Sequence, residues 1–167
     1  MSCLVTTNGG RAKVSGIEAE TVLTPVRYIR ADFSVAYLDA HYDEFALPPY
    51  NFAGRQLDRS PDWVVTAGTQ YTIPLGSAGE LVAGARTRVS DSYSLFIIGS
   101  RNFYRQPSFM KTDLTLTYNA PDARFYVQGY VKNLEDAVTV STVVVGARAS
   151  VQVADPRTYG VRAGFKF

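Results

Sequence analysis

The chain ends on the stretch PRTYGVRAGFKF, residues 156–167, and this stretch decides the fold class. From Tyr159 onward, every second residue is apolar or aromatic, and the residues between them are small, polar or basic. A period of two places the two sets on opposite faces of a β-strand. The stretch therefore predicts a strand with one apolar and one polar face that runs to the terminal Phe167.

The same two-residue period recurs in six earlier stretches, whereas helical periodicity is weak throughout. These stretches are residues 16–23, 28–39, 63–73, 81–90, 110–119 and 124–134. In residues 110–119 the phase changes, so that Met110, Leu114, Leu116 and Tyr118 form the apolar set. Together with the terminal stretch, the pattern predicts seven strands.

The predicted strands are joined by connections of alternating length. Residues 22–28, 74–80 and 119–125 are short and rich in the turn formers Pro, Gly, Asn and Asp. Residues 43–62 and 92–108 form long connections, and a third is predicted near residues 146–150. This order predicts an antiparallel, up-and-down arrangement with short turns at one end and long loops at the other.

Composition excludes several function classes. The 17 basic and 15 acidic residues are scattered, which argues against nucleic-acid binding. Cys3 and His41 are the single residues of their kinds, so we expect no disulfide, metal site, cofactor or nucleophile–base pair. Asp39 and Asp43 are the one carboxylate pair that invites an enzyme hypothesis, and both are expected at a strand end. We expect no enzyme activity, and neither a spanning helix nor a signal peptide is recognisable.

Two architectures share this strand pattern: a soluble antiparallel sandwich or barrel, and a transmembrane barrel. The polar face has charges of both signs in the middle of strands, which suits a wet interior. Trp63 and Tyr71 are eight residues apart on one face, about 20 Å along the membrane normal at a tilt of roughly 40°. That distance approaches the separation of two aromatic girdles. These features and the asymmetric loops favour the transmembrane barrel.

Four motifs resemble TonB-dependent outer-membrane receptors. PRTYGVRAGFKF is similar to the final strand of that family, and Asn133-Leu134-Glu135-Asp136 to its Asn-Leu-x-Asp motif. Residues 8–20, NGGRAKVSGIEAE, are similar to its Asn-Gly-Gly-x-Ala and Gly-Ile-Glu-x-Glu blocks. Between them, residues follow the usual order of the family: Tyr42, Phe45, Gly54, Leu57, Pro61 and Trp63. The resemblance covers essentially the whole chain.

The resemblance implies an all-β, antiparallel, up-and-down transmembrane β-barrel of 22 strands with a plug domain. Residues 1–167 are then expected to be a C-terminal segment of about the last seven strands, without plug or signal peptide. The implied location is the Gram-negative outer membrane. The implied partners are outer-membrane lipid, TonB, the plug domain, the barrel-assembly machinery and a small metal chelate such as a ferric siderophore. Tyr159, Phe165 and Phe167 would form the outer-membrane assembly signal.

Residues 93–109 form the candidate ligand loop, because aromatic rings and arginines suit an aromatic, anionic chelate. The candidate residues are Tyr93, Phe96, Arg101, Phe103, Tyr104 and Arg105. The alternative is that the rings pack the loop against its neighbours and the arginines are solvated.

The polar face contains charged residues that are expected to pair across strands or to contact the plug. They are Glu18, Glu20, Arg30, Asp32, Arg86, Arg88, Lys111, Asp113, Arg124, Lys132 and Arg162. Glu20 and Arg30 are a predicted cross-strand pair over a turn at Thr24-Pro25, and a shift of one register step would break it.

Two alternatives remain beside the receptor. A passive porin-like channel shares the alternation and the girdles, but it does not predict the Asn-Leu-x-Asp and Pro-Arg-Thr-Tyr-Gly blocks. A soluble β-sandwich binding module predicts that one face of the sheet packs against a second sheet.

Overall fold

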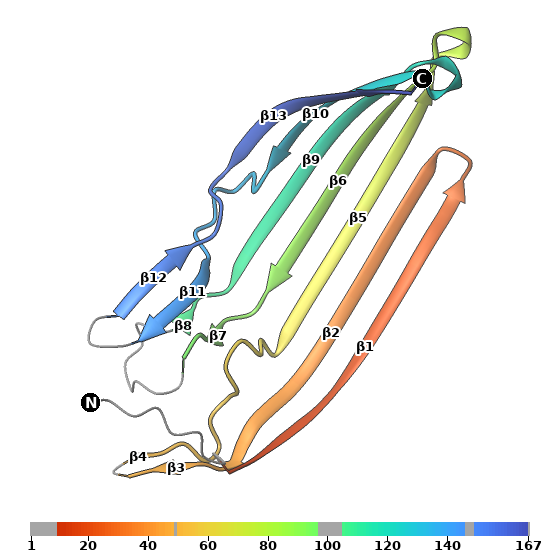
Figure 1. The fold of residues 1–167 in the computed structure, drawn as a ribbon. Helices are drawn as coiled ribbons and strands as arrows, with labels where there is room; N and C mark the ends of the chain where they lie inside the picture. Colours follow the sequence, from red (N-terminus) through yellow and green to blue (C-terminus); the bar gives the residue numbers. More distant parts are fainter. Residues whose placement is uncertain (1–9, 49, 97–104, 146–148, 167) are drawn as a thin grey trace.

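The computed structural model describes residues 10–48, 50–96, 105–145 and 149–166. Seven long strands form one antiparallel sheet, each paired with the next long strand along the chain (Figure 1). They are β1 (Arg11–Val26), β2 (Ile29–Glu44), β5 (Trp63–Pro74), β6 (Glu80–Ser90), β9 (Phe109–Asn119), β10 (Phe125–Lys132) and β13 (Thr158–Phe165). The seven predicted strands and their up-and-down order are confirmed.

Three short turns join strands at the upper end of the sheet in Figure 1. They lie at Arg27–Tyr28, at residues 75–79 and at residues 120–124, and the last two contain short 3-10 turns, Gly76–Ala78 and Pro121–Ala123. The first was expected at Thr24-Pro25, but β1 continues through both residues to Val26. Pro25 is tolerated because the register of β1 is irregular between Leu23 and Val26.

Each long connection, at the opposite end of the sheet, contains a small two-stranded sheet (Figure 1). The pairs are β3 (Ala46–Leu47) with β4 (Tyr50–Asn51), β7 (Tyr93–Ser94) with β8 (Arg105–Gln106), and β11 (Val140–Val145) with β12 (Ala149–Val153). The third connection was predicted near residues 146–150, but it extends from residue 133 to residue 157. Its valine-rich stretches pair with each other and add no strand to the main sheet.

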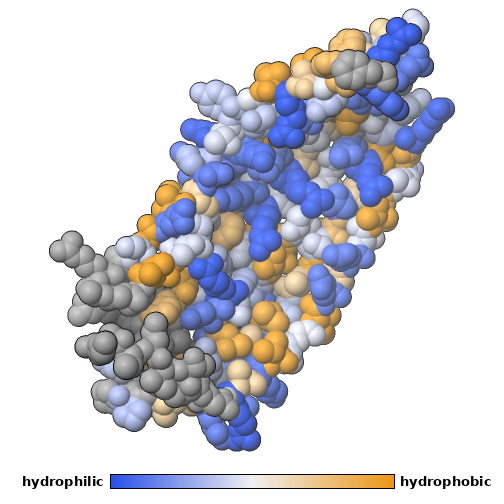
Figure 2. Space-filling model, viewed as in Figure 1, coloured by the Kyte–Doolittle hydropathy of each residue, from blue (hydrophilic) through white to orange (hydrophobic). Residues whose placement is uncertain are grey.

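The register gathers the two sets of side chains onto two faces of the whole sheet. One line of directly paired residues crosses all seven strands on the apolar face: Leu23, Ala31, Thr69, Ala85, Leu114, Val131 and Tyr159. A neighbouring line crosses the polar face: Val22, Asp32, Gly68, Arg86 and Asp113. Figure 2 shows hydrophilic residues spread over the middle of the sheet in the view of Figure 1. The predicted faces, including the phase change in β9, are confirmed.

Aromatic side chains lie near both ends of the apolar face. Tyr37 and Trp63 stack with ring centroids 4.8 Å apart at the end of the long connections. Tyr118 and Phe125 pack 5.9 Å apart near the short turns. Tyr71 shares this face with Trp63, as predicted, because their register partners Ile29 and Tyr37 both lie on it.

The main sheet is a single layer with almost no interior. The accessible surface of the chain is 11964 Å², whereas a compact soluble monomer of this mass exposes about 8,100 Å². Ala40, Phe52, Leu95 and Ala120 are the buried hydrophobic side chains in the described part of the chain. A β-sandwich requires a second sheet against one face, and no such layer is present among the described residues. The soluble sandwich alternative therefore loses its support.

Candidate functional site

The polar face contains a cross-strand ion pair at its centre. The Arg86 guanidinium on β6 lies 2.5 Å from the Asp32 carboxylate on β2, and it reaches across β5 at Gly68. A Cβ atom at Gly68 would lie 2.5 Å from Asp32 Oδ1, so glycine at this position makes room for the pair. The predicted pairing of charges across this face is confirmed at these two residues.

The specific pair predicted between Glu20 and Arg30 is wrong. Glu20 lies opposite Ser34, and Arg30 lies opposite Gln70 on the other side of β2. The cause is the position of the first turn, which lies at Arg27–Tyr28 and not at Thr24-Pro25. A displaced turn moves every later partner along the strand.

We expect the Arg86–Asp32 pair to contribute little to stability. The Arg86 and Asp32 side chains are 59% and 30% exposed, and exposed pairs contribute about 0–1 kcal/mol. Arg86→Gln should therefore lower the free energy of unfolding by less than about 1 kcal/mol, measured from the denaturant midpoint of the folded membrane protein. A larger loss would mean that Arg86 has a further anionic partner.

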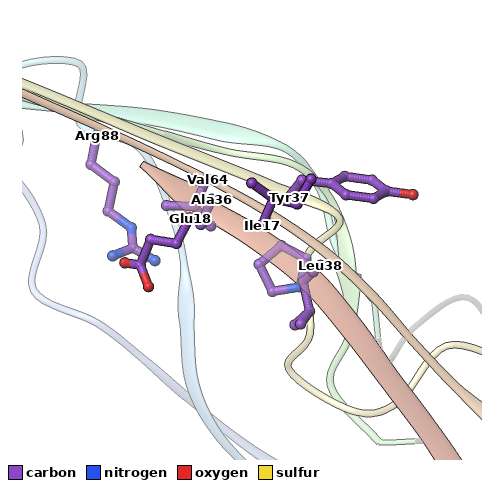
Figure 3. A pocket seen from close by; sticks show the side chains of 9 residues that line it. Ile17, Glu18, Ala36, Tyr37, Leu38, Val64 and Arg88 are labelled. Atoms are coloured by element: carbon purple, nitrogen blue, oxygen red, sulfur yellow. The ribbon is translucent and has the colours of Figure 1, made fainter. Parts of the chain in front are cut away.

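A second feature of the sheet is a cavity of about 450 Å³ between β1, β2, β5 and β6 (Figure 3). It is lined by Gly16, Ile17, Glu18, Ala36, Tyr37, Leu38, Pro61, Val64 and Arg88. Glu18 on β1 and Arg88 on β6 border the cavity from two sides, over small apolar residues of the strands between them (Figure 3). Arg88 also lies directly opposite Lys111 on β9. The cavity thus combines an apolar wall with one carboxylate and one guanidinium.

The structure describes three of the six predicted ligand-loop residues. Tyr93 lies on β7 and is partly buried, as is Phe96, whereas Arg105 on β8 is exposed. The Arg105 guanidinium donates to Ser92 Oγ at 2.6 Å, which places it beside β7. The other three candidates, Arg101, Phe103 and Tyr104, lie outside the described residues. Ligand contact by this loop remains a prediction.

An aromatic cluster in the first long connection was missed by the sequence analysis. Phe45 packs 4.9 Å from Tyr42 and 5.3 Å from Phe52, and Tyr50 packs 6.2 Å from Phe52. The Arg55 guanidinium lies over the Phe52 ring, 5.5 Å from its centroid. Burial raises the pKa of Tyr42, and the nearby Asp58 carboxylate raises it further. In the sequence, the signal for this cluster was the high density of aromatic residues between residues 42 and 52.

Polar contacts join the three long connections into one assembly. The Arg59 guanidinium donates to the Ser141 carbonyl at 3.0 Å, and the Arg59 N–H donates to the Ser94 carbonyl at 2.7 Å. Gln106 is 2% exposed; its Oε1 accepts from the Val140 N–H at 2.8 Å and its Nε2 donates to the Pro107 carbonyl at 3.1 Å. The connections therefore hold one another in place at the end of the sheet opposite the short turns.

Gln106→Ala is expected to release the third connection. The substitution leaves the Val140 N–H without its acceptor, at a cost of about 1–3 kcal/mol. Limited proteolysis of the folded protein should cut within residues 133–157 several times faster than in the unsubstituted protein. Equal cutting rates would show that other contacts hold this connection.

Two of the three predicted assembly-signal residues lie on the apolar face of β13. Tyr159 and Phe165 are 80% and 73% exposed, and Val161 between them is similarly exposed. Phe167 lies outside the described residues. Their exposure agrees with an apolar surrounding, and their recognition by an assembly machinery stays a prediction.

The single histidine lies between two carboxylates at the end of β2. His41 Nδ1 lies 2.9 Å from Asp39 and its Nε2 lies 3.4 Å from Asp43, so both carboxylates flank the imidazole at the end of β2. Within the described ranges, no group of three His, Cys, Asp or Glu side chains is placed to bind a metal ion. The same ranges contain no helix long and apolar enough to cross a membrane.

Comparison with known proteins gives matches in sequence and in structure. A family model described as TonB dependent receptor-like, beta-barrel, matches residues 2–134. No curated protein sequence matches the chain. The ferric yersiniabactin uptake receptor FyuA from Yersinia pestis superposes with a TM-score of 0.79 at 20% identity, over 96% of this chain and 24% of that one.

Two receptors from Acinetobacter baumannii are also similar in fold. The siderophore receptor PiuA superposes with a TM-score of 0.68 at 20% identity, over 91% of this chain and 21% of that one. The ferric preacinetobactin receptor BauA superposes with a TM-score of 0.69 at 16% identity, over 91% of this chain and 22% of the BauA chain. The chain thus spans less than a quarter of each of these three structures.

Proposed function

Because the chain belongs to the TonB-dependent receptor β-barrel family, we propose that it is a seven-strand sector of an outer-membrane receptor for active uptake of a metal chelate. The family consists of outer-membrane receptors and not of enzymes. The ligand class we propose is a ferric siderophore or a similar metal complex. The similarity of the sheet to three ferric-chelate or siderophore receptors supports this choice.

The observation that carries the proposal is the register of the seven strands. It brings apolar side chains of every strand to one face, from Ile17 on β1 to Val161 on β13. Such a face suits lipid, because an exposed apolar area of this extent is unfavourable in water. The opposite face, with Asp32, Arg86 and Arg88, suits the wet interior of a barrel.

The open edges of the sheet support its assignment to a larger barrel. Within the described residues, β1 and β13 each have one neighbouring strand. An open edge in lipid leaves backbone N–H and C=O groups unpaired, each at a cost of several kcal/mol. We propose that residues 1–167 are a C-terminal segment of the barrel and that further strands pair with β1 and β13.

The proposed partners follow from the same assignment. Outer-membrane lipid would surround the apolar face, and a plug domain would occupy the polar face in the complete receptor. TonB would supply the energy for uptake, and the barrel-assembly machinery would recognise the end of β13, with Tyr159, Phe165 and Phe167. The long connections and the cavity beside Arg88 would lie on the ligand's path.

The function is tested by uptake in cells that lack the gene and in cells that carry it on a plasmid. Under iron limitation, accumulation of ⁵⁵Fe is measured with a panel of purified ferric siderophores, with and without a protonophore. The proposal predicts that at least one siderophore delivers iron only when the gene and the proton-motive force are both present. Uptake that requires the gene but survives the protonophore would instead support the porin-like channel.

A further inference from the structure

The register of the last strand of the sheet, β13, must be fixed by something other than a tight turn. β13 has one neighbour in the described sheet, β10, and the chain reaches it only through the long connection of residues 133–157. A tight turn fixes the register of β9 and β10, but a connection of this length leaves many registers sterically accessible. Some other feature must therefore select the native pairing.

The alternation of side chains is insufficient for this selection. A slip of one residue would turn every side chain of β13 to the wrong face, so it is strongly disfavoured. A slip of two residues keeps Tyr159, Val161, Ala163 and Phe165 on the apolar face. Gln128, which lies opposite Arg162 in the native register, would then face Gly160 or Gly164. The hydrophobic pattern therefore tolerates the two-residue slip.

Asn133 makes contacts that depend on the native register. Its side chain is 4% exposed and its backbone has a φ of 53°. Oδ1 accepts from the Ala137 N–H at 2.9 Å, and Nδ2 donates to the carbonyls of Ala137 and Asp155 at 3.1 and 3.4 Å. One buried amide thus closes the turn after β10 and contacts the chain just before β13.

Asp136 makes the second link between the two ends of the connection. Its Oδ1 accepts from the Arg157 N–H at 2.7 Å, directly before β13 begins. The Arg157 guanidinium donates to the Leu134 carbonyl at 3.3 Å. With a φ of 55°, Asp136 also adopts a left-handed conformation, which Asn and Asp tolerate better than most residues. We call residues 133–136 together with 155–157 the clasp.

The clasp is anchored to β9 as well. The Asn133 N–H donates to Asp113 Oδ1 at 3.0 Å, and the Leu134 N–H donates to the Thr112 carbonyl at 2.9 Å. Glu135 accepts from the Thr112 N–H at 2.6 Å. Because β9 is held in the middle of the sheet by β6 and β10, the clasp positions Arg157 relative to a fixed neighbour.

Two tyrosines on the polar face favour the same register. Tyr130 lies opposite Gly160 and Tyr126 opposite Gly164. A Cβ atom at Gly160 would lie 2.7 Å from the Tyr130 hydroxyl oxygen, and one at Gly164 would lie 2.5 Å from the Tyr126 ring. A two-residue slip would place side chains, such as that of Arg162, where the tyrosine rings now cover glycine.

We propose that the clasp sets the register of β13 on β10 and so selects the native alignment of the last strand against its two-residue slips. The proposal concerns how the sheet is built and is independent of the ligand that the protein carries. It assigns a physical task to both Asn133-Leu134-Glu135-Asp136 and Asp155-Pro156-Arg157.

Disulfide trapping in isolated outer membranes tests the proposal, in a background without Cys3, the one cysteine of residues 1–167, and without any cysteine outside this range. Val127→Cys with Ala163→Cys reports the native register, since these residues are directly opposite. Val127→Cys with Val161→Cys reports a slip, because diagonal neighbours are about 7–8 Å apart and exceed disulfide reach in the native register. Both pairs are oxidised under identical conditions and quantified by mass spectrometry.

The clasp is weakened with Asn133→Gly and Asp136→Gly, which remove the side-chain contacts but permit the positive φ. We expect the ratio of slipped to native cross-link to rise by roughly tenfold in each. Asp136→Asn retains an acceptor oxygen and should leave the ratio unchanged. Ser141→Ala removes a contact to Gln152 within the same connection but outside the clasp, and should also leave it unchanged.

Asp136 is exposed, so its glycine variant is expected to fold even if the Asn133 variant does not accumulate. An unchanged ratio in Asp136→Gly and in Asn133→Gly overturns the proposal. The proposal is also overturned if a glycine variant accumulates less protein and the protein that remains in the membrane forms only the native cross-link. A rise in Ser141→Ala equal to that in the glycine variants would assign the effect to general loosening of the connection, and would overturn the proposal as well.

Discussion

Replacing Leu116 by arginine is expected to prevent the protein from accumulating as a folded barrel. Leu116 lies on the apolar face of β9, two residues before Tyr118, and is 50% exposed, with Ala83 and Gly129 as its direct cross-strand neighbours. None of these neighbours offers a hydrogen-bond acceptor in its side chain. An arginine on the lipid-facing side of a barrel costs up to about 2–4 kcal/mol, which is a large part of the stability of a typical domain.

The neighbouring residue provides a matched control. Thr115 lies one position earlier on β9, so its side chain is on the polar face, beside Gly84 and Arg86 in a cavity of about 240 Å³. Thr115→Arg should therefore accumulate at a level near that of the unsubstituted protein. The measurement is the folded fraction in outer membranes, read from the difference between unheated and heated samples on denaturing gels. Equal losses in the two variants would contradict the assignment of the faces.

Gly79→Ala is expected to destabilise the turn between β5 and β6 severely. Gly79 has φ 96° and ψ −141°, a region that is essentially accessible only to glycine. A Cβ atom here would also overlap the backbone carbonyl oxygen of Asn119, at the end of β9. The strained backbone and the main-chain collision together should cost about 3 kcal/mol or more.

A second variant in the same turn, Gly76→Ala, distinguishes the effect of backbone strain from that of the collision with Asn119. Gly76 has φ 63°, and a Cβ atom there would meet nothing within 4 Å. Gly76→Ala should therefore cost only about 1–2 kcal/mol, the penalty for a left-handed alanine. The denaturant midpoints of the two variants, measured on purified folded protein, give the comparison. Similar losses in both would show that the contact with Asn119 is relieved by a small movement.

The sequence by itself determined the number of long strands, the two faces of each strand and the family. These features follow from local patterns: the two-residue period in residues 63–73 or 156–167 predicts which side chains share a face without any knowledge of neighbours. Short turns at residues 74–80 and 119–125 were equally local, because Pro, Gly, Asn and Asp restrict the backbone where they occur.

The tertiary structure decided which residues meet across strands. The Glu20–Arg30 prediction failed because the first turn lies at Arg27–Tyr28, which alters the partners of both residues. The Arg86–Asp32 pair spans three strands through Gly68, and a contact of that kind depends on two registers at once.

The candidate site likewise depended on long-range contacts. The buried amide of Gln106 lies in a connection that the sequence marked only as long, and that of Asn133 lies in a motif at the end of a predicted strand, where the sequence did not indicate its contacts. Their partners are Val140 and Asp155, which become neighbours only after the strands have paired. Strand alternation is local and can be read along the chain, whereas register and loop contacts arise from backbone pairing between distant segments, and only the folded sheet determines them.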